Sequence, residues 1–235
     1  MESITSLTNK RIKRLNKLLS NKERNKSHQF LVFDLKSVKK AYQLHRLIEL
    51  YTLEKIDGIN NVPAYLVNKE IMNKIKSNST LIGVVEESAS SFKTKDKIIY
   101  LDEIADPSNL GKIIYLMKQY QYQTLILSNK CVSPYNYKCL EIAKDNIFDI
   151  DISYGDIASL NKLKKDHQII STGLSSSIYI NEFKPKNKYV LIFGNEARGV
   201  SPNILKISDV VIKIPIKNID SLNVAVAASI IMDNL

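Results

Sequence analysis

The chain has 235 residues, of which 44% are hydrophobic and 25% charged, and its formal net charge is +10. This composition supports a globular core and excludes a disordered tail, a collagen-like rod and a disulfide-stapled mini-protein. No apolar run approaches 18 residues and no secretory signal is evident, so we expect a cytoplasmic protein without a membrane partner. The spacing of Cys131 and Cys139 fits no zinc or redox motif, and His28, His45 and His167 form no cluster that would suggest a metal.

The first 90 residues predict short helices alternating with short strands. The first helix is capped by Thr8 or Asn9 and runs to about Ser20, with apolar side chains on one face. Its other face carries Lys10, Arg11, Lys13, Arg14 and Lys17. Further elements are a strand at 30–33, a helix at 36–44, strands at 47–53 and 64–67, a helix at 69–75 and a strand at 81–85. This pattern indicates a small α/β domain over residues 1–90.

Positive charge is concentrated at this end of the chain. Residues 1–50 contain twelve Lys or Arg against four Asp or Glu, an excess of eight. Such an excess favours a polyanionic partner such as RNA, because neutralised phosphates supply most non-specific nucleic-acid affinity. AT-rich genomes encode Lys, Asn and Ile heavily, and the extra Lys would produce the same positive charge. Charge alone therefore does not separate an RNA partner from a bias in genome composition.

The polar, Ser-rich segment EESASSFKTKDK over residues 86–97 reads as a linker, which we place at 91–97. A larger α/β domain then occupies residues 98–235. Its predicted strands lie at 98–101, 124–127, 168–172, 189–193 and 210–214, its helices at 109–120, 135–143, 156–165 and 222–232, with a further element at 147–152. Strands this apolar are buried on both faces, which indicates a parallel sheet covered by helices on both sides.

Three segments follow apolar strands of this domain: DEIADPSNLGKIIY (102–115), LIFGNEARGVSP (191–202) and VVIKIPIKNIDSLNVAVAA (210–228). Loops at the carboxyl ends of parallel strands are the usual ligand sites of open α/β sheets. Taken singly, each segment also has a structural explanation. Asn109 can cap a helix, Ser221 and Asn223 can begin one, and the Gly194–Gly199 loop lacks the Lys-Ser/Thr of a phosphate-binding P-loop.

Taken together, in this order and spacing, the three segments resemble the SpoU (TrmH-type) branch of the SPOUT RNA 2′-O-ribose methyltransferases. The resemblance covers residues 98–235 through DPSNLGKIIY, FGNEARGVSP and IKIPIKNIDSLNVAVAAS, and FLVFDLKSVKKAY matches more loosely. It implies a C-terminal parallel-sheet domain with a deep trefoil knot, an exception to the rule against knotted chains, preceded by a small α/β RNA-binding domain. It further implies a homodimer that methylates structured RNA, with ribosomal RNA favoured over transfer RNA.

The resemblance assigns residues to S-adenosylmethionine and to the ribose. Gly194 lies against the cofactor, and Ile214 and Leu222 supply backbone contacts and apolar walls to its adenosine. The polar residues around ribose and sulfonium are Asn109, Glu196, Ser221 and Asn223. Because the methyl group already carries an excellent leaving group, the protein mainly positions the 2′-hydroxyl and eases its deprotonation, and no metal is required.

The chain departs from the family pattern at the catalytic position six residues after Asn109. Relatives have Arg there and this chain has Tyr115, which offers one hydroxyl in place of a permanently charged planar fork. Ala197 also replaces a common Gly, and Asp34-Leu35 stands where relatives have an acidic-Gly pair. Two hypotheses remain open: an active enzyme in which Lys112, Lys118 or Arg198 replaces the missing charge, and a non-catalytic RNA-binding protein of the same fold.

Overall fold

The computed structural model describes residues 1–88, 95–216 and 221–235. Contacts divide the chain into two compact units, one of residues 1–89 with 133–148 and the other of residues 90–132 with 149–235. The sequence interpretation assigned all of 98–235 to the second domain, so the inclusion of 133–148 in the first unit differs from it. Of the predicted linker, residues 91–94 lie outside the described residues.

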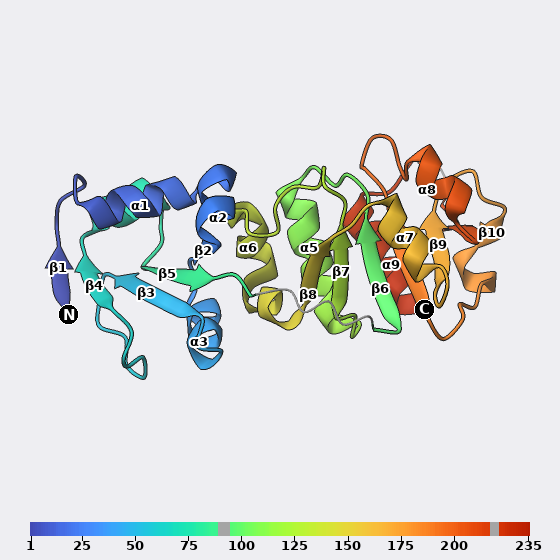
Figure 1. The fold of residues 1–235 in the computed structure, drawn as a ribbon. Helices are drawn as coiled ribbons and strands as arrows, with labels where there is room; N and C mark the ends of the chain where they lie inside the picture. The colour runs from blue at the N-terminus through green and yellow to red at the C-terminus, as the bar shows by residue number, and fades with distance from the viewer. Residues whose placement is uncertain (89–94, 217–220) are drawn as a thin grey trace. The chain divides into compact units, whose positions relative to one another are not determined.

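The first unit is built on a mixed sheet with the strand order β1-β4-β3-β5-β2 (Figure 1). Strand β4 is parallel to both of its neighbours, whereas β5 runs antiparallel to β3 and β2. The elements are β1 (Glu2–Ile4), α1 (Lys10–Leu18), α2 (Asn21–Ser27), β2 (Gln29–Val32), α3 (Leu35–Gln43), β3 (Leu47–Thr52), β4 (Ala64–Val67), α4 (Lys69–Ile75), β5 (Leu81–Glu86), α6 (Tyr137–Ala143) and the 3-10 helix η1 (Lys144–Asp149), which ends at the unit boundary.

Helix α1 forms where the sequence predicts it, because its cap and its apolar face act together. The Asn9 side chain accepts a hydrogen bond from the backbone N–H of Arg11 at 2.8 Å. Ile12, Leu15 and Leu18 are buried in the core that also contains Tyr51. The helix ends at Leu18, and Ser20 caps the separate helix α2, which the sequence interpretation did not predict.

The second unit is built on an all-parallel sheet with the strand order β10-β12-β9-β11-β6-β7-β8. The predicted parallel sheet is therefore confirmed. The elements are β6 (Lys97–Leu101), α5 (Pro107–Gln119), β7 (Thr124–Leu127), β8 (Asp151–Tyr154), α7 (Ile157–Leu163), β9 (Gln168–Thr172), β10 (Ile178–Tyr179), the 3-10 helix η2 (Ile180–Glu182), β11 (Tyr189–Phe193), α8 (Pro202–Ile207), β12 (Val210–Lys213) and α9 (Val224–Asn234).

Helices cover both faces of this sheet (Figure 1). On one face, Tyr100, Ile126 and Ile192 pack against Leu160 of α7 and Ile204 of α8. On the other face α5 and α9 lie side by side. Because all strands are parallel, the loops that follow β6, β7, β9, β11 and β12 emerge at one edge of the sheet. The trefoil knot implied by the resemblance stays a prediction.

Local predictions differ from the structure at two further places, the start of α5 and the segment 147–152. Helix α5 begins at Pro107 and is capped by Asp106, whose side chain accepts from the Ser108 N–H at 2.7 Å, so the prediction that Asn109 caps this helix is wrong. Asn109 lies inside the first turn and is buried, which frees its amide for contacts elsewhere. The apolar segment 147–152 forms the end of η1 and the start of β8 rather than one element.

Candidate active site

A cavity of about 520 Å³ opens at the edge of the sheet where the strands end. Among the described residues, its lining includes the ends of β9, β11 and β12 and the start of α9. Five of the predicted site residues line it: Gly194, Glu196, Ile214, Ser221 and Leu222. Segments that are far apart in the sequence therefore meet in one cavity, as the resemblance requires.

Gly194 allows the loop after β11 to fold back on itself. A Cβ built on Gly194 would lie 2.1 Å from the carbonyl carbon of Gly199 and 2.1 Å from the backbone nitrogen of Val200. Gly199 closes the loop with a left-handed backbone, φ +68°, and exchanges two backbone hydrogen bonds with Asn195. The loop shape thus depends on both glycines.

A chain of side-chain hydrogen bonds joins all three sequence segments. The Asn223 Nδ2 donates to Asn109 Oδ1 at 3.0 Å, and the Asn109 Nδ2 donates to Glu196 Oε1 at 2.9 Å. Asn223 also caps α9, because its Oδ1 accepts from the Ala225 N–H at 3.0 Å. Each amide therefore has its orientation fixed by its partners, and the Glu196 carboxylate is held at the cavity wall.

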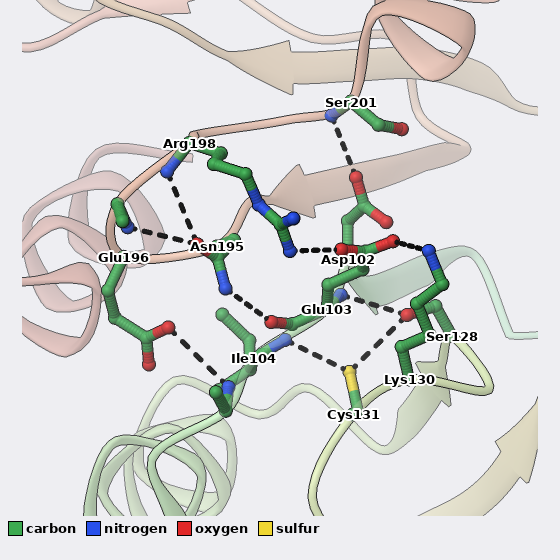
Figure 2. Close-up of polar contacts among 12 residues, drawn as sticks. Asp102, Glu103, Ile104, Ser128, Lys130, Cys131, Asn195, Glu196, Arg198 and Ser201 are labelled. Atoms are coloured by element: carbon green, nitrogen blue, oxygen red, sulfur yellow. Dashed lines mark hydrogen bonds and ion pairs between the residues drawn. The ribbon is translucent and has the colours of Figure 1, made fainter.

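Asn195, next to Gly194, braces the same loop from within (Figure 2). Its Oδ1 accepts from the N–H groups of Ala197 and Arg198, at 3.0 and 3.2 Å, and its Nδ2 donates to the carbonyl of Glu103 at 2.8 Å. The sequence interpretation assigned no role to Asn195 or Glu103, although both lie within the quoted motifs. Only the fold shows that the two motifs are bonded to each other.

Glu103 follows strand β6 and pairs with two cations. Its Oε1 accepts from Lys130 Nζ at 2.7 Å, and its Oε2 pairs with the guanidinium of Arg198. The hydrogen bond from Lys130, with the positive charges of Lys130 and Arg198, holds the pKa of Glu103 below its ordinary value. The carboxylate therefore remains ionised and keeps both cations in place at neutral pH.

The residues considered as substitutes for the family arginine are placed very differently. Tyr115 lies on α5 with 45% of its surface exposed, and it is not among the described residues that line the cavity. Lys118 pairs with Asp149 at 3.2 Å, and Lys112 is exposed on the same helix. Arg198 is the one of these candidates that lines the cavity within the described part of the chain.

The five basic residues predicted to bind RNA on α1 fall into two groups. Arg11 and Arg14 pair with the largely buried carboxylate of Glu49, at 3.2 and 2.8 Å, and the Tyr51 hydroxyl donates to the same carboxylate at 2.7 Å. These two arginines therefore fasten α1 to strand β3. Lys10, Lys13 and Lys17 are exposed.

Metal binding, thiol chemistry and membrane insertion have less support among residues 1–88, 95–216 and 221–235. No group of three or more His, Cys, Asp or Glu in these ranges is placed to hold a metal ion. Cys131 and Cys139 are free thiols, and burial raises the pKa of each. Of the helices in these ranges, none has the length and apolarity needed to cross a membrane.

Comparison with known proteins places this geometry in a family. Residues 96–233 match the model of the SpoU rRNA Methylase family. The 23S rRNA (guanosine(2553)-2′-O)-methyltransferase RlmP of Bacillus subtilis is 25% identical, and the match covers 100% of this chain and 99% of that protein. An uncharacterized tRNA/rRNA methyltransferase of Borreliella burgdorferi is 31% identical over 70% of this chain and 72% of its own length.

Solved structures agree on the fold. The crystal structure of an rRNA methyltransferase from Sinorhizobium meliloti, also solved with AdoMet bound, matches with a TM-score of 0.90 at 23% identity, over 99% of this chain and 96% of that one. The match spans both units, so the predicted α/β architecture is confirmed along the whole chain. The family model covers more than half of the chain, and the chain belongs to the SpoU rRNA Methylase family.

Proposed function

We propose that this chain transfers the methyl group of S-adenosylmethionine to a ribose 2′-hydroxyl of 23S rRNA. Family membership supports the reaction, and the match to RlmP along the full length of both proteins supports this substrate. The observation that carries the proposal is the hydrogen-bonded chain Asn223–Asn109–Glu196 beside the cavity, because it joins the three family motifs in one site. A tRNA substrate is the alternative, since a tRNA (guanosine(18)-2′-O)-methyltransferase of Aquifex aeolicus is 30% identical over 60% of this chain.

The cavity fits S-adenosylmethionine in size and in the character of its walls. Its volume of about 520 Å³ lies within the usual range for small-molecule sites. Ile214 and Leu222 offer apolar walls for an adenine ring, and Gly194 also lines the space. When bound, this cofactor supplies an activated methyl group with a good leaving group.

The polar residues of the site then act by positioning. Glu196 and Ser221 line the cavity and can accept and donate hydrogen bonds to a ribose at its mouth. Asn109 and Asn223 hold Glu196 in one orientation, which spares the cost of ordering it during the reaction. No metal is needed for this reaction.

The N-terminal domain, predicted over 1–90, supplies RNA affinity in this account. Its exposed Lys10, Lys13 and Lys17 are suited to phosphate contacts, and an rRNA substrate is consistent with the predicted cytoplasmic location.

A homodimer is supported by the resemblance and by two exposed apolar side chains, Tyr115 and Val226, on the adjacent helices α5 and α9. Light scattering of the purified protein tests the dimer.

Methyl transfer is tested with tritiated S-adenosylmethionine and in vitro transcribed 23S rRNA, with tRNA as a second substrate. The wild type is expected to label 23S rRNA. Asn223→Asp keeps the oxygen that caps α9 but cannot donate to Asn109. The variant should therefore fold and lose at least about tenfold in transfer rate, which is about 1.4 kcal/mol in activation free energy. The exposed Asn161→Ala on α7 is the matched control. RNA binding with no transfer by the wild type would instead support the non-catalytic alternative.

A further inference from the structure

We propose that Arg198 and Lys130, held together by Glu103, form a phosphate-binding pair at the rim of the cavity, and that its ligand is a phosphodiester of the RNA substrate. The inference rests on the proposed function, since it places the RNA backbone beside the reacting ribose. It also accounts for the missing arginine on α5, because it supplies positive charge from a different loop.

The charged groups of Arg198 and Lys130 lie on either side of the Glu103 carboxylate and point toward it (Figure 2). Lys130 contacts Oε1 of Glu103, and Arg198 contacts Oε2. The side chains of Lys130 and Arg198 are 76% and 70% exposed, whereas that of Glu103 is 19% exposed. The cluster therefore carries a net charge of +1 with its positive groups outermost, and this is the arrangement that an incoming anion requires.

The backbone of Glu103, whose carboxylate lies between the cations, is fixed by hydrogen bonds at its N–H and at its carbonyl. The Glu103 N–H donates to Ser128 Oγ at 2.8 Å, and its carbonyl accepts from Asn195 Nδ2 at 2.8 Å. Glu103 has a left-handed backbone, φ +56°, a conformation that costs a non-glycine residue energy and persists where its surroundings impose it. Asn195 Oδ1 also accepts from the backbone N–H of Arg198, so one residue positions both Arg198 and the carboxylate-bearing Glu103.

The pair of Arg198 and Lys130 lies beside the proposed reaction site. Arg198 lines the cavity, and it lies two residues from Glu196, which belongs to the hydrogen-bonded chain. A ribose in an RNA strand has phosphates on either side of it. A ribose 2′-hydroxyl presented to the cavity must therefore bring a phosphate to the rim, where a planar guanidinium and an ammonium can contact its oxygens.

The ion pairs with Glu103 do not prevent Arg198 and Lys130 from binding a phosphate. Exposed salt bridges contribute little to folding stability, because water screens the charges of both partners. A phosphate that contacts both Arg198 and Lys130 gains two charge-assisted hydrogen bonds. The Glu103 carboxylate can continue to pair with both side chains at the same time. The pair thus serves as a preorganised anion site rather than only a structural link between two loops.

The experiment measures binding of in vitro transcribed 23S rRNA by filter retention across a salt series. Arg198→Ala and Lys130→Ala are each expected to reduce the slope of log K against log salt by about 0.7 to 0.9, the contribution of one phosphate contact. Lys165→Ala, which removes an exposed charge in the turn after α7, is the control and should leave the slope unchanged. Arg198→Lys should restore part of the loss. Thermal unfolding checks that each variant is folded.

Slopes equal to the control in both alanine variants would overturn the proposal. Calorimetric titration with S-adenosylmethionine separates this failure from failure of the proposed function, and Lys130→Ala should bind the cofactor like the wild type, because Lys130 does not line the described part of the cavity. Reduced slopes in the alanine variants of a protein that binds no cofactor would support the phosphate-binding pair and contradict the proposed methyltransferase function. Unchanged slopes in the alanine variants of a protein that binds the cofactor and transfers methyl groups would contradict the phosphate-binding pair and support the methyltransferase function.

Discussion

At the scale of single residues, the site depends on contacts that only the fold reveals. The sequence motifs identify Asn109, Glu196 and Asn223 as candidates, and the structure joins them in one hydrogen-bonded chain. No periodicity or spacing indicates that Asn109 is buried within α5 rather than at its cap, because Asp106, three positions earlier, is an equally good capping residue. Glu103 and Asn195 were missed for the same reason, since their partners are about 90 residues distant.

Gly194 gives the sharpest prediction at this scale. Gly194→Ala is expected to displace the loop backbone, since the added Cβ would lie 2.1 Å from Gly199 and Val200, and to weaken S-adenosylmethionine binding by at least about tenfold, or 1.4 kcal/mol. Gly58→Ala is the control: Gly58 has a left-handed backbone, φ +84°, but nothing lies within 4 Å of the added Cβ. That variant should cost only about 1–2 kcal/mol of folding stability. Wild-type cofactor affinity in Gly194→Ala, measured by calorimetry, would contradict the assignment.

Tyr115 tests which group supplies the missing charge. If Arg198 supplies it, the Tyr115 hydroxyl has no part in the reaction. Tyr115→Phe should then keep kcat for methyl transfer within about threefold of the wild type, a change of less than about 1 kcal/mol in activation free energy. The exposed position of Tyr115 outside the described cavity lining supports this expectation. A hundredfold loss of kcat in a folded Tyr115→Phe would show that the hydroxyl itself takes part.

At the scale of secondary-structure elements, helix α1 combines two functions that the sequence could not separate. Its basic face looks uniform in the sequence, but the structure divides it into two arginines paired with Glu49 and three exposed lysines. The division follows from the docking of α1 against β3, a contact between residues about 35 positions apart. Amphipathicity predicts such a helix, and it does not predict which cations are already paired.

Matched variants of α1 and β3 separate these functions. Glu49→Gln removes the charge that both arginines contact and should destabilise the first unit by about 1–2 kcal/mol in chemical unfolding. Lys13→Ala should change stability by less than about 0.5 kcal/mol. It should also reduce the salt dependence of RNA binding, because an exposed phosphate contact is lost. Equal effects of the two variants on stability and on RNA binding would show that the division is incorrect.

Elsewhere, the sequence predicted elements well where an apolar pattern and a cap coincide. Strands β6, β7, β9 and β11 each contain a buried stretch with at least two Ile, Leu or Val residues, and each forms where expected. Short elements such as α2 and β10 were missed. Strand β10 forms through pairing with β12, in a register set by residues more than 30 positions away, whereas α2 is capped locally by Ser20.

At the scale of the whole molecule, the α/β class and the parallel sheet followed from the sequence, but the division of the chain did not. Residues 133–148 lie between two strands of the second unit in the sequence and nevertheless pack with the first unit. The Tyr135 ring stacks on Phe30 with centroids 4.5 Å apart, and Cys139 and Leu140 of α6 are buried. An amphipathic helix shows that it has a partner but not which sheet supplies it.

Mapping the product tests most directly whether this chain methylates a ribose in 23S rRNA. The wild-type protein, S-adenosylmethionine and in vitro transcribed 23S rRNA are incubated, and the RNA is digested and analysed by mass spectrometry. We expect a single methylated nucleotide that carries the methyl group on its ribose 2′-oxygen, formed at least about tenfold more slowly by Asn223→Asp at matched RNA occupancy. Methylation of a base, or saturated RNA and cofactor binding with no methylated nucleotide, would contradict the proposed function.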